Sequence, residues 1–243
     1  MALSDTDAGS PVPAFKRNFL NSCLSANVLT FGTYTLKSGR KSPYFFNAGS
    51  FHSGDLLSAI GTAYAHTIIN FLSSNSELPR PNTIFGPAYK GIPLACCTLL
   101  ELQRIDPVQW GKVEYSFNRK EKKDHGEGGG LVGGSLQGAN VLVVDDVITA
   151  GTAMRETIEI VKREGGKVVG FVVAVDRMEK MPSTTDDDGV PRPSAMGQIR
   201  KEYGVPTASI VTLDDLIELL RMKGDETDME RLKDYRRRYI ASD

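Results

Sequence analysis

The chain has 243 residues, of which 40% are hydrophobic and 24% are charged. A chain of this size buries roughly 70 to 75% of its unfolded surface, which is enough for one α/β domain with additions. Its 29 basic and 30 acidic residues give a formal net charge of −1. This balance gives no overall attraction for nucleic acid or for a membrane surface, so any anion must be bound by a local cluster of basic groups.

The N-terminus lacks the basic segment and following apolar stretch that a targeting sequence would show. The longest apolar run, at 168–175, is far shorter than the ~20 residues of a membrane span. We therefore expect a cytoplasmic protein with no membrane partner.

The first 80 residues are predicted to form helices and a small two-stranded unit. Apolar side chains recur at helical spacing over 13–28 and over 54–72. Between these helices, 31–36 and 42–47 are predicted to be short strands joined by a basic turn.

The basic turn and the second strand place aromatic side chains next to a cation. Lys37 lies in the turn, and Phe45 and Phe46 lie in the strand. Flat aromatic surface beside a positive charge suits a planar anion, through stacking and charge pairing. Two phenylalanines in the core of a hairpin would give the same pattern, so the residues alone leave both interpretations open.

From residue 81 onward, apolar strands alternate with helices, which indicates an α/β fold with a parallel sheet flanked by helices. The N-terminal helix and short strands would form a hood over the carboxyl edge of this sheet. We expect a single domain over 1–243, with 1–80 as the N-terminal helices and hood and 81–243 as the α/β core. The predicted core strands are 83–85, 113–116, 141–144, 167–175 and 208–213, and the predicted core helices are 92–104, 153–161, 195–203, 214–222 and 225–239.

Residues 141–154 carry the strongest chemical signal. Four apolar residues in a row suit a central strand buried on both faces. Asp145 and Asp146 follow them at the carboxyl edge, where open α/β sheets bind ligands. The turn 149–153 has only small side chains, so its N–H groups and the following helix N-terminus can approach a phosphate. Because the carboxylates can accept hydrogen bonds from sugar hydroxyls, the stretch indicates a site for a ribose 5-phosphate.

A second strand-to-helix junction, at 86–91, lies at the same edge of the predicted sheet. Its glycines permit close approach of the backbone, and Lys90 supplies a point charge suited to a phosphate oxygen. The glycine spacing also fits the phosphate loop of a nucleotide hydrolase, whose partner strand would end in Asp. However, Ile92 and Pro93 stand where that loop needs Lys and Ser or Thr.

The polar segment 117–138 is predicted to be a mobile, charged loop. Basic residues from Arg119 to His125 are followed by several glycines, with no apolar periodicity. A loop of this length inside a compact domain is usually functional or disordered. Three glycines between 128 and 133 have the spacing of a dinucleotide-binding fingerprint, but a strand and no helix follows them, so that interpretation is rejected.

Five motifs in this order resemble those of the orotate phosphoribosyltransferases, a family of type I phosphoribosyltransferases. The resemblance covers about residues 30–180. The motifs are the hood segments 35–40 with 42–47, the junction 86–91, the basic loop 117–130, the signature 141–153 and the segment 174–179. The implied fold is that of type I phosphoribosyltransferases, and the implied substrates are phosphoribosyl pyrophosphate and orotate.

The resemblance also assigns site residues by position. The residues implied to bind phosphoribosyl pyrophosphate are Lys37, Tyr89, Lys90, Arg119, Lys120, Lys123, His125, Asp145, Asp146, Val147, Ile148, Thr149, Ala150, Gly151, Thr152 and Ala153. Those implied to bind orotate are Phe45, Phe46, Thr149 and Arg177, with the arginine on the orotate carboxylate. Lys123, His125, Asp145 and Asp146 are implied to be catalytic.

The implied reaction gives orotidine 5′-monophosphate and pyrophosphate, a step of de novo pyrimidine (UMP) synthesis. Breaking the bond at ribose C1 leaves a positive sugar and a departing pyrophosphate, so catalysis means stabilising opposite charges on either side. Orotate is already an anion and needs little base catalysis. A Mg²⁺ ion is implied, bound mostly by substrate oxygens and water, because the sequence offers no dense carboxylate cluster for an all-protein metal site.

The family further implies a homodimer in which loop 117–138 is shared between subunits.

Two other functions share part of the pattern. A purine phosphoribosyltransferase would have the 141–153 signature without the aromatic hood or Arg177. A regulator that senses phosphoribosyl pyrophosphate would not need the basic loop and would carry a nucleic-acid surface. The sequence shows no basic face for that surface, so we expect no nucleic-acid partner.

Overall fold

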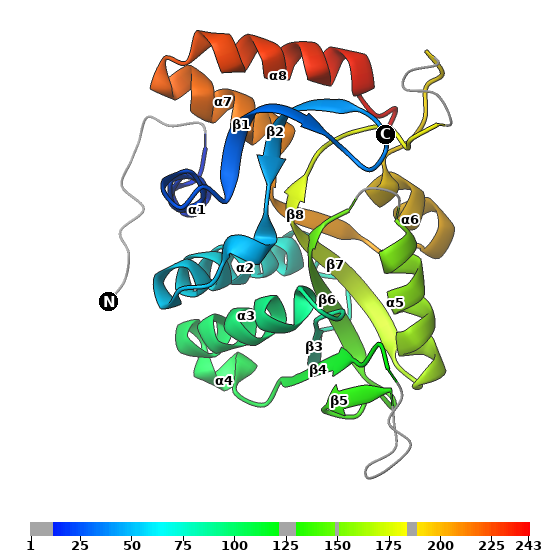
Figure 1. The fold of residues 1–243 in the computed structure, drawn as a ribbon. Helices are drawn as coiled ribbons and strands as arrows, with labels where there is room; N and C mark the ends of the chain where they lie inside the picture. Colours follow the sequence, from blue (N-terminus) through cyan, green and yellow to red (C-terminus); the bar gives the residue numbers. More distant parts are fainter. Residues whose placement is uncertain (1–11, 122–129, 149–150, 184–188) are drawn as a thin grey trace.

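A six-stranded sheet runs through the centre of the computed structural model, which describes residues 12–121, 130–148, 151–183 and 189–243 (Figure 1). The helices are α1 (Ala14–Ser25), α2 (Gly54–Ser74), α3 (Gly91–Ile105), α4 (Pro107–Trp110), α5 (Thr152–Arg163), α6 (Ala195–Tyr203), α7 (Leu213–Lys223) and α8 (Glu226–Tyr239), with a 3₁₀ turn η1 at Ala48–Ser50. The strands are β1 (Leu29–Thr35), β2 (Lys41–Phe46), β3 (Thr83–Phe85), β4 (Glu114–Asn118), β5 (Leu131–Gly133), β6 (Asn140–Val147), β7 (Lys167–Asp176) and β8 (Thr207–Thr212).

The order of the central strands is β5-β4-β3-β6-β7-β8. All neighbours are parallel except β5, which pairs with β4 in the antiparallel sense. After β3 the chain moves outward to β4, whereas after β6 it moves in the other direction to β7 and β8. The strand order therefore reverses between β3 and β6, and such a switch point creates a crevice at the carboxyl ends of the strands.

Helices cover both faces of the sheet. In Figure 1, α2 and α3 lie on one side of it, and α5 and α6 lie on the other. Side chains from β6 alternate between two apolar clusters: Leu142 and Val144 pack on the α2 and α3 side, while Val141 and Val143 pack with α5. This two-sided burial explains why the predicted central strands have no polar alternation.

The hood is built from both ends of the chain. Strands β1 and β2 form an antiparallel pair, and α8 packs on β2. Lys16 of α1 forms an ion pair with Asp215 of α7 at 2.8 Å. Helix α2 packs against α1 as well as against α3, β7 and β8, so it joins the hood to the core. Contacts of α1 with α7 and of β2 with α8 cross the predicted boundary at residue 80, which stays a prediction.

Helix α2 also has the length and hydropathy that a membrane-crossing helix would need. Its inner face, which includes Ile60, Tyr64 and Ile68, is buried in the main apolar cluster. Packing within the domain is thus a sufficient reason for its apolar composition.

Two short elements, β5 and α4, were not predicted from the sequence. The range 117–138 is not loop throughout, because 117–118 end β4 and 131–133 form β5, so the part between paired strands is shorter than predicted. Helix α4 begins with Pro107 and is capped by Asp106, whose side chain accepts hydrogen bonds from the N–H groups of Val108 and Gln109. An Asp-Pro pair is a typical helix start, so this signal was available in the sequence.

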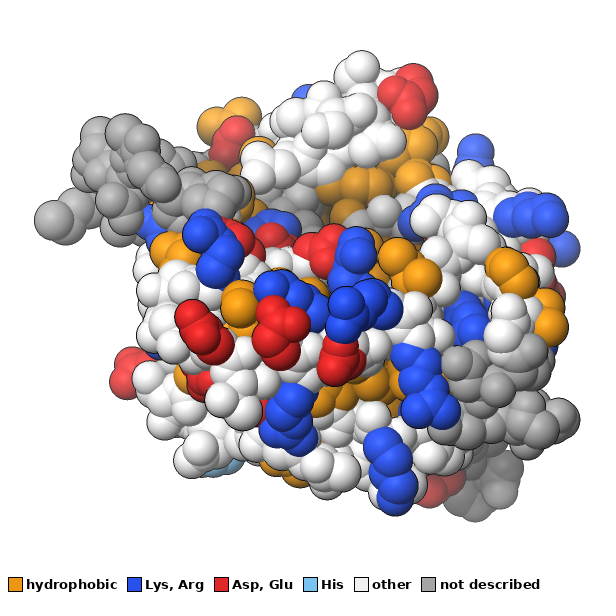
Figure 2. Space-filling view, turned by 90° about the horizontal axis from the view of Figure 1, so that it is seen from above, with side chains coloured by type: hydrophobic (Ala, Val, Ile, Leu, Met, Phe, Trp, Pro, Cys, Tyr) orange, Lys and Arg blue, Asp and Glu red, His pale blue; other side chains and the backbone are white. Residues whose placement is uncertain are grey.

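Charged side chains on the face that carries α7 and α8 are of mixed sign (Figure 2). Many of them pair within one helix, as Arg221 does with Glu218, and Arg236 of α8 pairs with Asp214 of α7 at 2.5 Å. Exposed pairs of this kind add little to stability, because water and salt screen the charges. On the described part of this face, positive and negative groups are interspersed.

The tight packing of β7 against α2 generates a stability prediction. A Cβ atom added to Gly170 would lie 2.8 Å from a ring carbon of Phe71 and 2.9 Å from a methyl group of Leu142. Gly170→Ala should therefore lower the free energy of unfolding by about 1 to 3 kcal/mol, as overpacking does. Gly54→Ala is the matched control, because a Cβ there meets no atom within 4 Å. Urea unfolding would measure both, and equal midpoints for the two variants would contradict the packing argument.

Candidate active site

Two carboxylates at the end of β6 form the centre of the site. Asp146 pairs with Lys90, its Oδ2 lying 2.9 Å from Nζ, and its Oδ1 accepts a hydrogen bond from the N–H of Val147. Asp145 has no ion pair with a described residue, and its Oδ1 accepts from the N–H of Asp146 at 2.9 Å. The two carboxylates therefore have different partners and are not equivalent.

The surroundings of Asp145 disfavour its charge. Burial raises the pKa of Asp145 to about 6, and the negative charge of Asp146 adds to the shift, while the N–H of Asp146 and the charge of Lys90 oppose it. Tyr64 of α2 donates a hydrogen bond from its hydroxyl to the main-chain oxygen of Asp145 at 2.7 Å. Tyr64 thus supports the backbone of Asp145 from α2. We did not predict this contact, and no motif identified it.

The N-terminus of α5 follows these carboxylates directly. Gly151 has a φ of 73°, and no side chain among the described residues caps the helix, so the first N–H groups of α5 suit an anion. Thr152 and Ala153 are exposed at this end of the helix. Val147 and Ile148 are half-buried and pack against the two apolar clusters. Thr149 and Ala150 lie outside the described residues.

The junction after β3 lies beside β6, across the switch point. Its two glycines pack closely: a Cβ on Gly86 would lie 2.1 Å from the carbonyl oxygen of Gly91. The N–H of Ala88 donates to Oδ1 of Asn118, at the end of β4, at 2.9 Å. Tyr89 is 60% exposed and follows a cis peptide bond. The structure thus brings Lys90 to Asp146, as expected from parallel strands that end at one edge.

The base of the basic loop lies next to this junction. The Nζ of Lys120 lies 5.0 Å from the centre of the Tyr89 ring. The N–H of Arg119 donates to the carbonyl oxygen of Gly130 at 2.7 Å, which closes the base of the loop beyond β4 and β5. Lys123 and His125 lie outside the described residues, so their predicted roles stay predictions.

The hood separates the two phenylalanines that we expected on one surface. Consecutive residues of a strand point to opposite sides. Phe45 is 42% exposed and its ring lies 5.4 Å from that of Tyr34. Phe46 instead packs inward, with its ring 6.0 Å from that of Phe51. Lys37 is exposed in the turn between the strands.

Arg177 lies just beyond β7, at the same edge as Asp145. It is 7% exposed, and its Nε lies 2.6 Å from Oε1 of Glu179. Arg177 and Ile148 line one small hollow of about 20 Å³. The structure therefore brings the predicted base-binding arginine next to the segment that leads into the phosphate turn.

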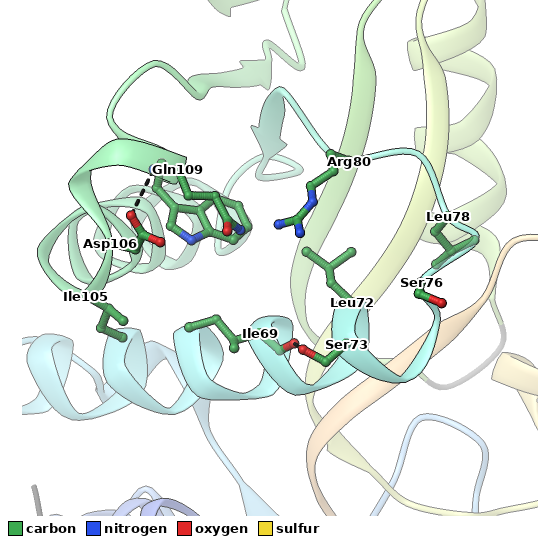
Figure 3. Close-up of a pocket in the computed structure, with 10 residues that line it drawn as sticks. Ile69, Leu72, Ser73, Ser76, Leu78, Arg80, Ile105, Asp106 and Gln109 are labelled. Atoms are coloured by element: carbon green, nitrogen blue, oxygen red, sulfur yellow. Dashed lines mark hydrogen bonds between the residues drawn. The ribbon is translucent and has the colours of Figure 1, made fainter.

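A larger pocket of about 340 Å³ lies elsewhere (Figure 3). It is lined by α2, the segment before β3, and α3 with α4, and includes Leu72, Arg80 and Trp110. Because Arg80 comes just before β3, this pocket lies towards the amino end of that strand. It contains none of the predicted site residues.

Comparisons with known proteins agree with this geometry. A family model described as a phosphoribosyl transferase domain matches residues 58–192. An orotate phosphoribosyltransferase of Neurospora crassa is 53% identical over 94% of this chain and 97% of its own. One from Methylococcus capsulatus is 44% identical over 93% of this chain and 97% of its own. The crystal structure of an orotate phosphoribosyltransferase from Francisella tularensis has a TM-score of 0.73 at 35% identity, covering 92% of this chain and 99% of that one.

The raised pKa of Asp145 predicts how stability depends on pH. A carboxyl group whose folded pKa is raised stabilises the fold fully below its ordinary pKa, and this contribution is lost as the pH rises through about 6. Asp145→Asn cannot ionise, so its stability relative to the native chain should increase between pH 4 and 7, by about 2 to 3 kcal/mol. Chemical unfolding at several pH values would measure this difference.

Asp146→Asn is the matched control. Its gain in stability at neutral pH should be smaller, because loss of the ion pair with Lys90 offsets the relief of repulsion on Asp145. If the curves of the native chain and of Asp145→Asn run parallel across this range, the carboxyl group of Asp145 is not disfavoured by its surroundings.

Proposed function

Since the chain belongs to the orotate phosphoribosyltransferase family, we propose that it transfers the 5-phosphoribosyl group of phosphoribosyl pyrophosphate to orotate in a Mg²⁺-dependent reaction. The products are orotidine 5′-monophosphate and pyrophosphate, and the reaction belongs to pyrimidine nucleotide synthesis. The protein is thus an enzyme of pentosyl transfer.

The position of three groups at one edge of the sheet supports this proposal in addition to family membership. The junction after β3, the carboxylates of β6 and Arg177 after β7 all lie at the carboxyl edge of adjacent strands, around the switch point. One edge of the sheet thereby carries the predicted phosphate turn, a cation suited to pyrophosphate and an arginine suited to a carboxylate. Phosphoribosyl pyrophosphate and orotate, bound next to each other, could contact all three.

The charges at this edge suit the separation of a positive sugar from pyrophosphate. Lys90, Arg119 and Lys120 lie on the side of the junction and can neutralise the leaving group. A pyrophosphate oxygen near Lys90 would compete with Asp146 for the ammonium group. In this proposal Lys123 and His125 add to the same cluster, and the N-terminus of α5 holds the 5′-phosphate.

The acidic pair would act on the ribose. Ionised carboxylates accept hydrogen bonds from hydroxyl groups, and they also favour positive charge that develops at C1. Asp145 and Asp146 differ in burial and partners, so their contributions should differ.

The residues at the site fit a metal ion that is bound mainly by the substrate. Within the described ranges, no three His, Cys, Asp or Glu side chains come together in a way that could hold a metal ion. Asp145 and Asp146 could supply at most part of the six oxygen ligands of Mg²⁺, which usually keeps several waters and binds substrate phosphates. When bound, the ion would neutralise part of the pyrophosphate charge.

An assay of pyrophosphate release tests the proposed function directly. The protein would be incubated with phosphoribosyl pyrophosphate, Mg²⁺ and either orotate, uracil, adenine or hypoxanthine. We expect pyrophosphate release with orotate. The release should stop when a chelator removes Mg²⁺ and should recover when Mg²⁺ is restored. Release with a purine but not with orotate would reject the proposal.

Arg177 should determine affinity for the base. Arg177→Ala should raise KM for orotate by about tenfold or more, because a charged hydrogen-bond partner is lost, and should change KM for phosphoribosyl pyrophosphate much less. Steady-state kinetics with each substrate varied in turn would measure both constants. A larger effect on KM for phosphoribosyl pyrophosphate would place Arg177 outside the base site.

We also propose a homodimer in which the loop between β4 and β5, within the predicted range 117–138, completes the partner's site. The base of the loop, at Lys120 and Tyr89, lies at the site edge, and the loop carries most of the predicted cations. A loop that closes over the leaving group would exclude water during the chemistry.

Complementation between two impaired variants, assayed at an orotate concentration well below the KM of Arg177→Ala, tests the shared site. Lys123→Ala keeps the base site, and Arg177→Ala keeps the loop. If the loop acts in the partner subunit, a hybrid dimer has one site with every group, and activity should reappear after mixing and subunit exchange. Native mass spectrometry would show whether hybrids form. Inactive hybrids would mean that each loop serves its own subunit.

A further inference from the structure

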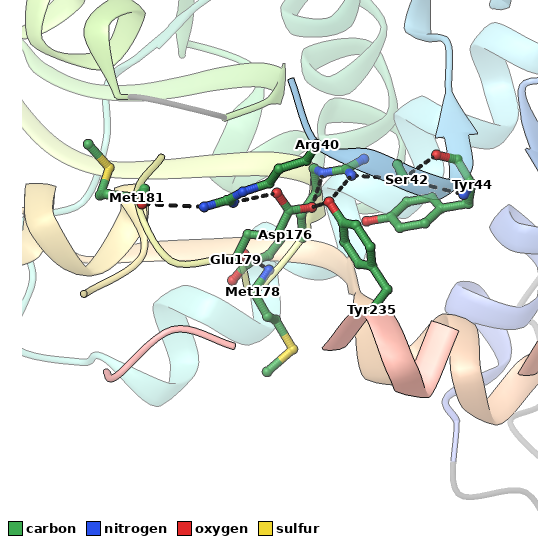
Figure 4. Close-up of polar contacts among 9 residues, drawn as sticks. Arg40, Ser42, Tyr44, Asp176, Met178, Glu179, Met181 and Tyr235 are labelled. Carbon is green, nitrogen blue, oxygen red and sulfur yellow. Dashed lines mark hydrogen bonds and ion pairs between the residues drawn. The ribbon is translucent and has the colours of Figure 1, made fainter. Parts of the chain in front are cut away.

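A cluster of buried charges lies where the hood meets the carboxyl end of β7 (Figure 4). Arg40 is 2% exposed and Arg177 is 7% exposed. Glu179 lies between them: its Oε1 accepts from Nε of Arg177 at 2.6 Å, and its Oε2 accepts from Nη1 of Arg40 at 3.1 Å. Buried charges are costly unless they are paired and hydrogen-bonded. One carboxylate therefore fixes two arginines.

The hydrogen bonds of Arg177 leave one edge of its guanidinium available. Nε donates to Glu179, while Nη2 donates to Oγ of Ser42 at 3.0 Å and to the hydroxyl of Tyr235 at 3.2 Å. Nη1 has no hydrogen bond to any residue that the structure describes. The ring centre of Tyr44 lies 4.5 Å from the central carbon of the group. The guanidinium is thus held in one orientation, with the two donors of Nη1 unused.

Tyr235 joins the arginine to its carboxylate partner. It lies on α8, far along the chain from Arg177, and its hydroxyl donates to Oε1 of Glu179 at 2.7 Å while it accepts from Arg177. Burial raises the pKa of this hydroxyl, so it stays protonated and can donate. Without the hydroxyl, Nη2 would lose one acceptor and Glu179 would lose one donor, so both groups could turn.

Helix α8 has other attachments that do not involve this hydroxyl. Arg231 donates to Oγ1 of Thr33 in the hood at 3.1 Å. The ring of Tyr239 packs 4.8 Å from that of Tyr235, and the guanidinium of Arg40 lies 4.6 Å from the centre of the Tyr239 ring. Loss of a single hydroxyl should therefore leave the helix in place, and its effect on the arginine can be measured separately.

We propose that Tyr235 is a positioning residue of the base-binding site. Its hydroxyl, together with Glu179, orients Arg177 so that Nη1 is presented to the carboxylate of the base. This inference rests on the proposed function, in which Arg177 binds orotate. It makes α8 part of the base site, although α8 carries none of the motifs that identify the family.

Tyr235→Phe removes the hydroxyl and keeps the ring. We expect KM for orotate to rise about tenfold, the loss typical of a hydrogen bond to a charged group. KM for phosphoribosyl pyrophosphate and kcat should change less than about twofold, and Tm should fall by only a few degrees, so that the enzyme stays folded at the assay temperature. Tyr203→Phe is the matched control, because Tyr203 lies on α6 and is 38% exposed, and it should leave all of these values unchanged.

A double-mutant cycle separates positioning from general stability. If Tyr235 acts through Arg177, Tyr235→Phe should have little further effect on KM for orotate when Arg177→Ala is already present. Additive effects of the two changes would overturn the proposal, as would a lower Tm with equal losses for both substrates.

The test also distinguishes this inference from the proposed function. An unchanged KM for orotate in Tyr235→Phe, with an active native enzyme, would overturn the role of Tyr235 alone. A native enzyme that releases no pyrophosphate with orotate would overturn both.

Discussion

The reversal of strand order between β3 and β6 is the constraint on which the rest of the site depends. After β3 the chain runs towards β4, and after β6 it runs in the opposite direction towards β7. The segments that follow these two strands therefore diverge and leave a crevice between them. The ion pair between Lys90 and Asp146 spans that crevice at 2.9 Å. The other groups of the site lie around it, because β4 and β7 are the next strands on either side.

Much of this arrangement could be predicted from the sequence, because it follows from local rules. Parallel strands end at one edge, so Lys90 and Asp146 were expected to lie close together. The apolar runs of β6 and β7 indicated strands with helices on both faces, and the two apolar clusters confirm this. For Phe45 and Phe46 we expected one shared surface. The alternation of side chains along a strand instead predicts that the two rings point to opposite sides, as the structure has them.

Contacts between distant segments could not be predicted in the same way. Nothing in the composition of α8 distinguishes Tyr235, which bonds to Arg177, from Tyr239, which packs against Arg40. Which of the two tyrosines reaches Arg177 depends on how α8 packs on β2, and this arrangement is set by the packing of the whole hood. For the same reason, the sequence did not indicate that α7 and α8, from the other end of the chain, contact the hood.

The two-ended hood has a consequence for the order in which the protein is assembled during synthesis. A chain emerging from the ribosome presents α1, β1 and β2 long before α7 and α8, so Lys16 has no Asp215 to pair with and Arg177 has no Tyr235 until those helices appear. Contacts so far apart in sequence carry a high cost of loop closure and form late. The sheet and its carboxyl edge can be assembled first, whereas Arg177 reaches its final orientation only when almost the entire chain has been made.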